Sequence, residues 1–260
     1  MKYKNYIFDL YGTLIDIDSD ERKLSLWRKL SDLYACYGAI YTPKELRKAF
    51  FRMDKEERLK VKNELGTDRP EIKLEKVFVR LLTEAPKLNV KKSEDTARSI
   101  RIPDDMSVWS EFMANAFRTL SRSYIRNYDK TLYTLDTLRK NGCSTFLLSN
   151  AQAIFTRPEI SLLELEERFD RMYISSDYGR MKPDPVFLET LISDNSLSRE
   201  DTVMVGDTVE NDVLIAYSCN IDAILVNTSE LSKKQIKKQA KELGIERSFK
   251  TVSSIDGILF

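Results

Sequence analysis

Asp9 stands at the end of a short apolar run, residues 6–8, and is followed by a turn that contains Gly12 and Thr13. In open α/β sheets, ligands bind at the carboxyl ends of the strands. A carboxylate at such a strand end can act as a nucleophile or as a metal ligand. Gly12 allows close approach of a ligand to the backbone, and Thr13 offers a hydroxyl for hydrogen bonding. Taken alone, the segment is also consistent with a plain turn after a strand.

A second polar pair, Ser149-Asn150, follows the apolar residues 146–148. A hydroxyl and nearby backbone N–H groups at a strand end can hold an anionic phosphoryl oxygen. An isolated Ser-Asn pair in this position is more often only a turn or a helix cap. The pair therefore gains meaning only from the other segments.

Lys182 lies in a loop where Pro183 and Pro185 follow it closely. The prolines stiffen the loop and start the next predicted helix. A lysine held in this way can neutralise a nucleophile and the charge that develops in a transition state. A loop lysine without such a role is normally solvated.

Two acidic residues, Asp207 and Asp212, follow the apolar residues 203–205 and Gly206. Carboxylate oxygens at a strand end suit Mg²⁺, which binds through one or two carboxylates together with water and phosphate oxygens. The alternative interpretation is a helix-capping Asp followed by an exposed helical acid.

The four segments occur in the order of a nucleophilic Asp, a hydroxyl, a Lys and an acidic pair. In this order they resemble the four motifs of the haloacid dehalogenase (HAD) superfamily, in its subfamily I form with a helical C1 cap. The family's known chemistry implies catalytic, substrate-binding and metal-binding positions in this chain. The catalytic residues are Asp9, Ser149 and Lys182; the substrate-binding residues are Tyr11, Thr13 and Asn150; the metal site is Asp9, the Tyr11 main-chain carbonyl, Asp207 and Asp212. Within the metal site, the resemblance gives Asp212 the role of orienting a metal-bound water or Lys182.

The pattern of apolar residues divides the chain into two parts. Short apolar runs alternate with amphipathic stretches in the C-terminal half, which predicts a parallel sheet with helices on both faces. Predicted strands cover residues 144–148, 171–175, 202–205, 222–226 and 250–253, and predicted helices cover 129–141, 160–169, 185–193, 211–219 and 229–243. Between about residues 18 and 128, apolar residues recur at helical spacing and no convincing strand is found. We therefore predict a doubly wound, Rossmann-like α/β core, residues 1–17 and 129–260, with an inserted all-helical cap, residues 18–128.

Composition excludes several kinds of chemistry. The 260 residues contain no histidine, which excludes Ser-His-Asp triads and histidine metal sites. Three scattered cysteines form no Cys-x-x-Cys pair and suit a reducing compartment. A net charge of +1, from 42 basic and 41 acidic residues, gives no reason to expect a nucleic-acid or membrane partner. Without an apparent signal peptide or membrane span, the expected location is the cytoplasm.

One position departs from the family's phosphatases. Most of them carry a second Asp two residues after the nucleophile, where it protonates the leaving oxygen and then activates water; here that position is Tyr11. A phenol is a poor base at neutral pH because its ordinary pKa is about 10. The first motif thus resembles the dehalogenases, whose halide leaves without a proton and which work without metal. The Gly206-Asp207 pair resembles the phosphatases instead.

The combined expectation is a Mg²⁺-dependent hydrolase of a small phosphorylated metabolite, acting through an aspartyl-phosphate intermediate. The cap is expected to exclude water and to contact the rest of the substrate. Two alternatives stay open: a metal-independent 2-haloacid dehalogenase-like hydrolase, and a weakly active or inactive member that binds or regulates. The sequence predicts neither the physiological substrate nor the oligomeric state.

Overall fold

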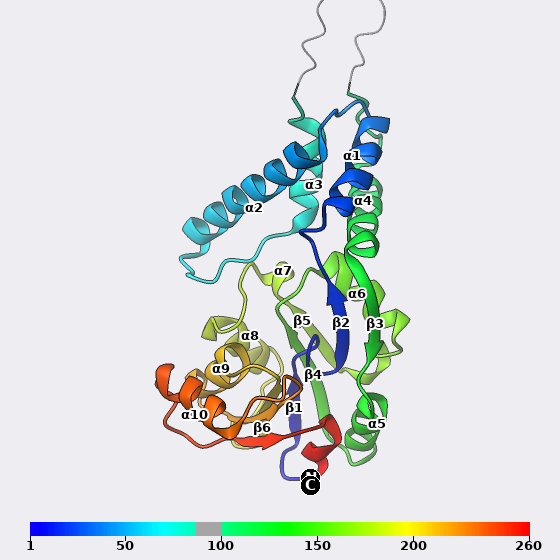
Figure 1. Ribbon diagram of the computed structural model, residues 1–260. Coiled ribbons are helices and arrows are strands. Elements are labelled where there is room, and N and C mark those ends of the chain that lie inside the picture. Colours follow the sequence, from blue (N-terminus) through cyan, green and yellow to red (C-terminus); the bar gives the residue numbers. More distant parts are fainter. Residues whose placement is uncertain (87–99) are drawn as a thin grey trace, which may run out of the picture.

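The computed structural model of this chain describes residues 1–86 and 100–260. A parallel six-stranded sheet, in the order β5-β4-β1-β6-β7-β8, forms the centre of the molecule (Figure 1). Its strands are β1 (Asn5–Phe8), β4 (Ser144–Ser149), β5 (Arg171–Ile174), β6 (Thr202–Gly206), β7 (Asp222–Val226) and β8 (Lys250–Val252). The helices that follow them are α5 (Thr131–Lys140), α6 (Ala153–Leu162), α7 (Ser175–Tyr178), α8 (Pro185–Asp194), α9 (Leu214–Ser218) and α10 (Lys233–Glu242). The predicted α/β class is confirmed.

Alternation of side chains along β1 explains why helices cover both faces of the sheet. Tyr6 and Phe8 point to one face, where they share a buried cluster with Leu135 of α5. Ile7 points to the other face and packs with Phe187 of α8. Both faces of the strand are therefore apolar, as expected for a parallel sheet buried on both sides.

The strand order brings three predicted site segments together. β1 lies between β4 and β6, and Phe8 is in register with Leu147 on one side and Val205 on the other. Asp9, Ser149 and Asp207 lie at the carboxyl ends of these three neighbouring strands. This edge of the sheet is where open α/β folds bind ligands.

A second set of helices lies at one end of the molecule, beyond the carboxyl edge of the sheet (Figure 1). These are α1 (Leu24–Cys36), α2 (Pro43–Leu65), α3 (Leu74–Thr83) and α4 (Met106–Ser121). Their apolar stripes form a separate aromatic core, in which the ring of Phe117 lies 5.8 Å from Trp27, 5.3 Å from Phe50 and 5.5 Å from Phe78. Phe155 of α6 joins this core and links it to the sheet.

Two antiparallel strands, β2 (Ile15–Ser19) and β3 (Arg122–Asn127), connect the sheet to this helical segment. The prediction that residues 18–128 contain no strand is therefore wrong for β3. The strand is short and mostly polar, and most of it is exposed or half-buried, so it lacks the regular apolar alternation that indicates a strand. Pairing with β2 stabilises it instead.

Two predicted helices also have different bounds. The helix expected at residues 160–169 is α6, which begins at Ala153 and contains Pro158; Glu166–Arg168 is a separate 3₁₀ turn. Because a proline inside a helix removes a hydrogen bond, Pro158 argued against a helix in the sequence. The first turns of α6 were therefore not predicted. The helix expected at 211–219 begins with a π-helical turn, Val209–Val213, before α9.

The loop between α2 and α3 contacts the loop that carries Lys182. The N–H of Glu71 donates to the carbonyl of Gly179 at 3.0 Å, and the N–H of Met181 donates to the carbonyl of Arg69 at 3.0 Å. In addition, the Thr67 hydroxyl donates to Asp184. The helical segment is thus attached to the sheet at this loop as well as through β2 and β3. Within residues 1–86 and 100–260, no helix is long and apolar enough to cross a membrane.

Candidate active site

Lys182 forms the centre of the buried charge cluster. Its Nζ lies 2.6 Å from Asp9 Oδ1 and 2.7 Å from Asp212 Oδ1, and the side chain is 2% exposed. The amide of Asn150 fixes its main chain, accepting from the Lys182 N–H at 2.6 Å and donating to the Lys182 carbonyl at 3.0 Å. Asn150, predicted to bind substrate, therefore uses both ends of its amide to hold this loop.

Asp207 follows β6 directly and contacts the turn after β1. Its Oδ1 accepts a hydrogen bond from Thr13 Oγ1 at 3.1 Å, and Thr13 is also 3.5 Å from Asp9 Oδ2. Gly12 passes directly against this carboxylate: it has φ +87°, and a Cβ built on it would lie 2.5 Å from Asp207 Oδ2. Glycine is therefore needed here for both backbone conformation and space.

Substitution of Gly12 by Ala tests this close approach. Gly142 has a similar φ of +77° with nothing within 4 Å of a built Cβ, so Gly142→Ala is the matched control. A non-glycine residue in this region of backbone space costs about 1–3 kcal/mol, which both variants should lose in urea unfolding. Gly12→Ala should lose about 0.5–1.5 kcal/mol more, because Asp207 must move away from Thr13. Equal losses would show that the contact with Asp207 imposes no constraint.

Three carboxylates gather around a single ammonium. Ligand oxygens of Asp9, Asp207 and Asp212 lie within 4.8 Å of one another. Burial raises the pKa of Asp9. The pKa of Asp207 is raised to about 7, mainly by burial and to a lesser extent by repulsion from Asp9 and Asp212. Burial alone would lower the pKa of Lys182, but the carboxylates of Asp212 and Asp9 raise it above its ordinary value. The cluster thus carries more negative than positive charge when it is fully ionised.

Asp212 has little capacity left for a further partner. While Oδ1 accepts from Lys182, Oδ2 accepts from the N–H of Thr208 at 3.0 Å and from its hydroxyl at 2.9 Å. Gly206 makes room for this arrangement, since a Cβ there would lie 2.2 Å from Asp212 Cγ. Both oxygens of Asp212 therefore serve to hold Lys182 and the π-helical turn.

Ser149 has a buried hydroxyl without a partner. The residue is 1% exposed at the end of β4, and its Oγ has no hydrogen-bond partner within the described residues. Leaving a buried hydroxyl unsatisfied costs free energy. A ligand atom bound at this strand end would supply the missing hydrogen bond.

Tyr11 is directed away from the carboxylates. Its phenol donates to Glu159 of α6 and lies 3.1 Å from the hydroxyl of Thr156. Glu159 also accepts hydrogen bonds from Arg118 Nε at 2.8 Å and from Arg122 Nη1 at 2.7 Å. Burial, with the Glu159 charge second, raises the pKa of Tyr11 well above its ordinary value. This phenol is therefore unsuited to exchanging protons near neutral pH.

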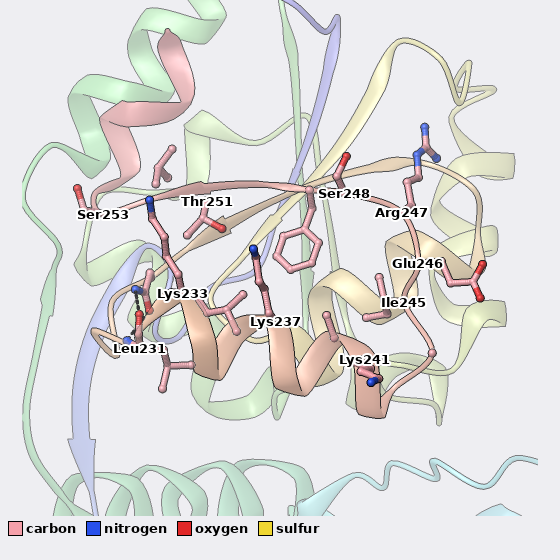
Figure 2. A pocket seen from close by; sticks show the side chains of 16 residues that line it. Leu231, Lys233, Lys237, Lys241, Ile245, Glu246, Arg247, Ser248, Thr251 and Ser253 are labelled. Carbon is pink, nitrogen blue, oxygen red and sulfur yellow. Dashed lines mark hydrogen bonds between the residues drawn. The ribbon is translucent and has the colours of Figure 1, made fainter.

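A cavity of about 440 Å³ adjoins these residues. Tyr11 and Asn150 line it at the sheet edge, and α2 and α4 line it from the other side with Phe50 and Arg118. A larger groove of about 950 Å³ lies elsewhere, where α10 faces the β8 segment, and Lys233 is among the residues that line it (Figure 2). Two predicted substrate-binding residues, Tyr11 and Asn150, line the smaller cavity, whereas no predicted site residue lines the groove. We therefore take the smaller cavity as the candidate substrate cavity.

Comparison with known proteins identifies the family. The sequence pattern of the haloacid dehalogenase-like hydrolases matches residues 82–226, more than half of the chain. The chain belongs to this family. In this haloacid dehalogenase-like hydrolase, three of the four predicted motif segments, with Asp9, Lys182 and Asp207 with Asp212, lie in one largely buried cluster.

Two curated relatives are phosphatases. The chain is 28% identical over 142 residues to glyceraldehyde 3-phosphate phosphatase of Methanothermobacter thermautotrophicus. The aligned segment covers 55% of this chain and 60% of that protein. It is 29% identical over 97 residues to phosphoglycolate phosphatase of Colwellia psychrerythraea. This second aligned segment covers 37% of this chain and 42% of that protein. The match thus spans about half the length of these relatives.

Solved structures share the fold of this haloacid dehalogenase-like hydrolase over nearly its full length. A HAD phosphatase from Thermococcus onnurineus has a TM-score of 0.55 at 20% identity, covering 94% of this chain and 100% of that one. A 2-haloacid dehalogenase from Pseudomonas syringae has a TM-score of 0.63 at 17% identity, covering 99% and 96%. At these identities the likeness concerns the fold alone.

Proposed function

We propose that this chain is a Mg²⁺-dependent phosphatase that hydrolyses a small phosphorylated molecule. The observation that supports this most strongly is the cluster of three carboxylates, two of which pair with Lys182. Oxygens bound to one Mg²⁺ lie about 3–4 Å apart, and all of its preferred ligands are oxygens. The carboxylates of Asp9 and Asp207, with the Tyr11 main-chain carbonyl, would hold the ion. When bound, it would offset the excess negative charge and polarise a phosphoryl oxygen.

The side chains have separate roles in the proposed reaction. Asp9 attacks phosphorus, the bond from phosphorus to the leaving oxygen breaks, and an aspartyl-phosphate forms; water then hydrolyses it to phosphate and the free Asp9 carboxylate. Lys182 neutralises the nucleophile and the phosphoryl oxygens. Ser149 donates its unpartnered hydroxyl to one of those oxygens. Asp212 is a positioning residue, because both of its oxygens are used to hold Lys182 and Thr208.

We also propose that the inserted segment, residues 18–128, acts as a cap over residues 1–17 and 129–260. Its own aromatic core supports an independent packing unit, and residues of α2 and α4 line the cavity beside Tyr11. Such a cap would keep bulk water away from the aspartyl-phosphate. The cavity it covers is large enough for a small metabolite and too small for a polymer.

The decisive experiment is a substrate panel with and without Mg²⁺. Phosphate release that requires Mg²⁺ would support the proposed function. Metal-independent release of halide from 2-haloacids would favour the dehalogenase alternative, which the first motif suggests. Binding of phosphorylated ligands without turnover would favour the binding or regulatory alternative.

The environment of Tyr11 predicts a strong dependence on the leaving group. Without a carboxylate at this position, a poor alkoxide leaving group lacks a proton donor, and general acid–base help is worth about 10²–10⁴-fold. We therefore expect acyl and aryl phosphates to react faster than sugar or alkyl phosphates. The measurement is kcat/KM for phosphate monoesters of rising leaving-group pKa.

Tyr11→Asp is the matching variant. It should raise the rate for alkyl phosphates if the missing carboxylate limits that reaction. It also removes the hydrogen bond to Glu159, so its unfolding free energy should be measured beside Tyr11→Phe, which loses the same bond without gaining a carboxylate. A leaving-group series that is flat for the wild type would mean that another acid supplies the proton.

A further inference from the structure

The cavity beside Tyr11 contains both basic and acidic side chains, but its basic groups are already paired. Arg58 Nη1 lies 2.9 Å from Glu71, and its Nε lies 3.1 Å from Asp54. Arg118 makes a two-point pair with Glu159, at 2.8 and 3.1 Å. Within the described residues, these two arginines are the basic groups that line the cavity. Three acids, Glu21, Asp54 and Glu71, line the cavity beside them, so a substrate carboxylate entering here would meet a lining with more negative than positive charge.

Glu21 is the exception among the acids of the cavity. It lines the cavity, yet its carboxylate has no hydrogen-bond or ion-pair partner among the side chains that the structure describes. Burial raises its pKa, and the nearby Asp54 adds to this, although Arg118 and Arg58 lower it. The carboxylate is therefore a partly desolvated acceptor that a ligand can reach and satisfy.

The main chain at Glu21 is held in place by a buried tryptophan. The indole N–H of Trp27 donates to the Glu21 carbonyl at 2.8 Å, and Trp27 itself is fully buried in the aromatic core of α1–α4. Phe50 and Phe51 line the same cavity and give it an apolar wall. An acceptor anchored beside aromatic rings is a typical arrangement for orienting a small ligand.

From this geometry we infer that Glu21 recognises the part of the substrate beyond the phosphate, and that this part carries hydroxyl or amino donors and no carboxylate. The inference rests on the proposed phosphatase function. It favours polyol, aldehyde-alcohol or amino-alcohol phosphates. It disfavours phosphorylated carboxylic acids, because Glu21 would repel their carboxylate and the acids of the cavity lining outnumber its arginines.

A set of two-carbon phosphates tests the inference with little change in size. The probes are 2-aminoethyl phosphate, 2-hydroxyethyl phosphate and phosphoglycolate. Each is measured as a competitive inhibitor of p-nitrophenyl phosphate hydrolysis with Mg²⁺ at about pH 8, well above the ordinary pKa of a glutamate. For the wild type, the inhibition constant should rise in that order. In Glu21→Gln, the ratio of the constants for phosphoglycolate and 2-aminoethyl phosphate should fall by about 10- to 100-fold, the worth of a hydrogen bond to a charged group.

Asp18→Asn is the matched control. Asp18 is an exposed acid on β2, three positions before Glu21, and does not line the cavity. It should keep the wild-type order and ratio, whereas a general change in net charge would shift both variants alike. Using inhibition constants makes the result independent of how well each probe is turned over.

The outcomes separate this inference from the proposed function. If the wild type does not hydrolyse p-nitrophenyl phosphate with Mg²⁺, the phosphatase proposal fails and the inference fails with it. If hydrolysis occurs but phosphoglycolate binds as well as the amine, or no probe inhibits, only the inference is overturned. A Glu21→Gln variant that loses kcat equally for all substrates, together with one limb of its pH profile, would make Glu21 a proton donor instead.

Discussion

Replacement of Asp9 by Asn is expected to reduce phosphate release by a factor of about 10⁴ or more, the size of effect seen when a catalytic nucleophile is removed. Asn has nearly the same shape but is a poor nucleophile. Asp9 is buried beside Lys182, whose Nζ lies 2.6 Å away and keeps Asp212 as a second partner. The loss should therefore appear in kcat, with the fold retained.

Two measurements accompany this variant. Its unfolding free energy should not fall greatly, because removal of one of three crowded carboxylates relieves repulsion while one ion pair is lost. Mass spectrometry of the wild type, quenched during turnover of an aryl phosphate, should detect a phosphate adduct on the peptide containing Asp9, and Asp9→Asn should lack it. Retention of more than a few per cent of wild-type activity would contradict the proposed mechanism.

Removal of the metal is the second change with a large expected effect. Chelation, or Asp207→Asn, should lower phosphatase activity by about 10³-fold, because a bound cation contributes several kcal/mol to the stabilisation of transition-state charge. Asp207 is the carboxylate whose pKa is raised to about 7 by burial and by its acidic neighbours. A cation placed there would lower that pKa and remove the repulsion.

Thermal unfolding provides a readout that does not depend on activity. A ligand at 100 times its dissociation constant stabilises the folded state by about 2.7 kcal/mol, so saturating Mg²⁺ should raise the Tm of the wild type by several degrees. Asp207→Asn should lose most of this rise. Glu210→Gln is the control, since Glu210 is an exposed acid in the same turn and lies outside the carboxylate cluster. Full activity after chelation would exclude the metal-dependent mechanism.

The sequence predicted the sheet and the motif positions because strand ends are local features. An apolar run followed by a polar residue marks where a strand stops, and parallel strands place those ends together. Asp9 and Asp207 could be identified in this way, and Lys182 by the prolines that follow it in its loop. Their order along the chain made the family resemblance specific.

Contacts between distant segments could not be predicted in the same way. Glu159 binds Tyr11, which lies 148 positions away in the sequence, and Arg118, which lies 41 positions away. No local sequence pattern marks Glu159 as a partner of either residue. Similarly, the apolar stripes of α1–α4 predicted a helical core but gave no indication that Glu21 lines the cavity. The strand β3 was missed because its stability comes from pairing with β2, and its own residues are mostly polar.

The loop between α2 and α3 is hydrogen-bonded to the chain segment that carries Lys182. Its hydrogen bonds with Gly179 and Met181 lie on the chain segment that leads into Lys182. Any swing of α2 and α3 away from the sheet must break them, and that segment would lose its support. If substrate enters by such a movement, entry and the ion pair between Lys182 and Asp9 would be thermodynamically coupled.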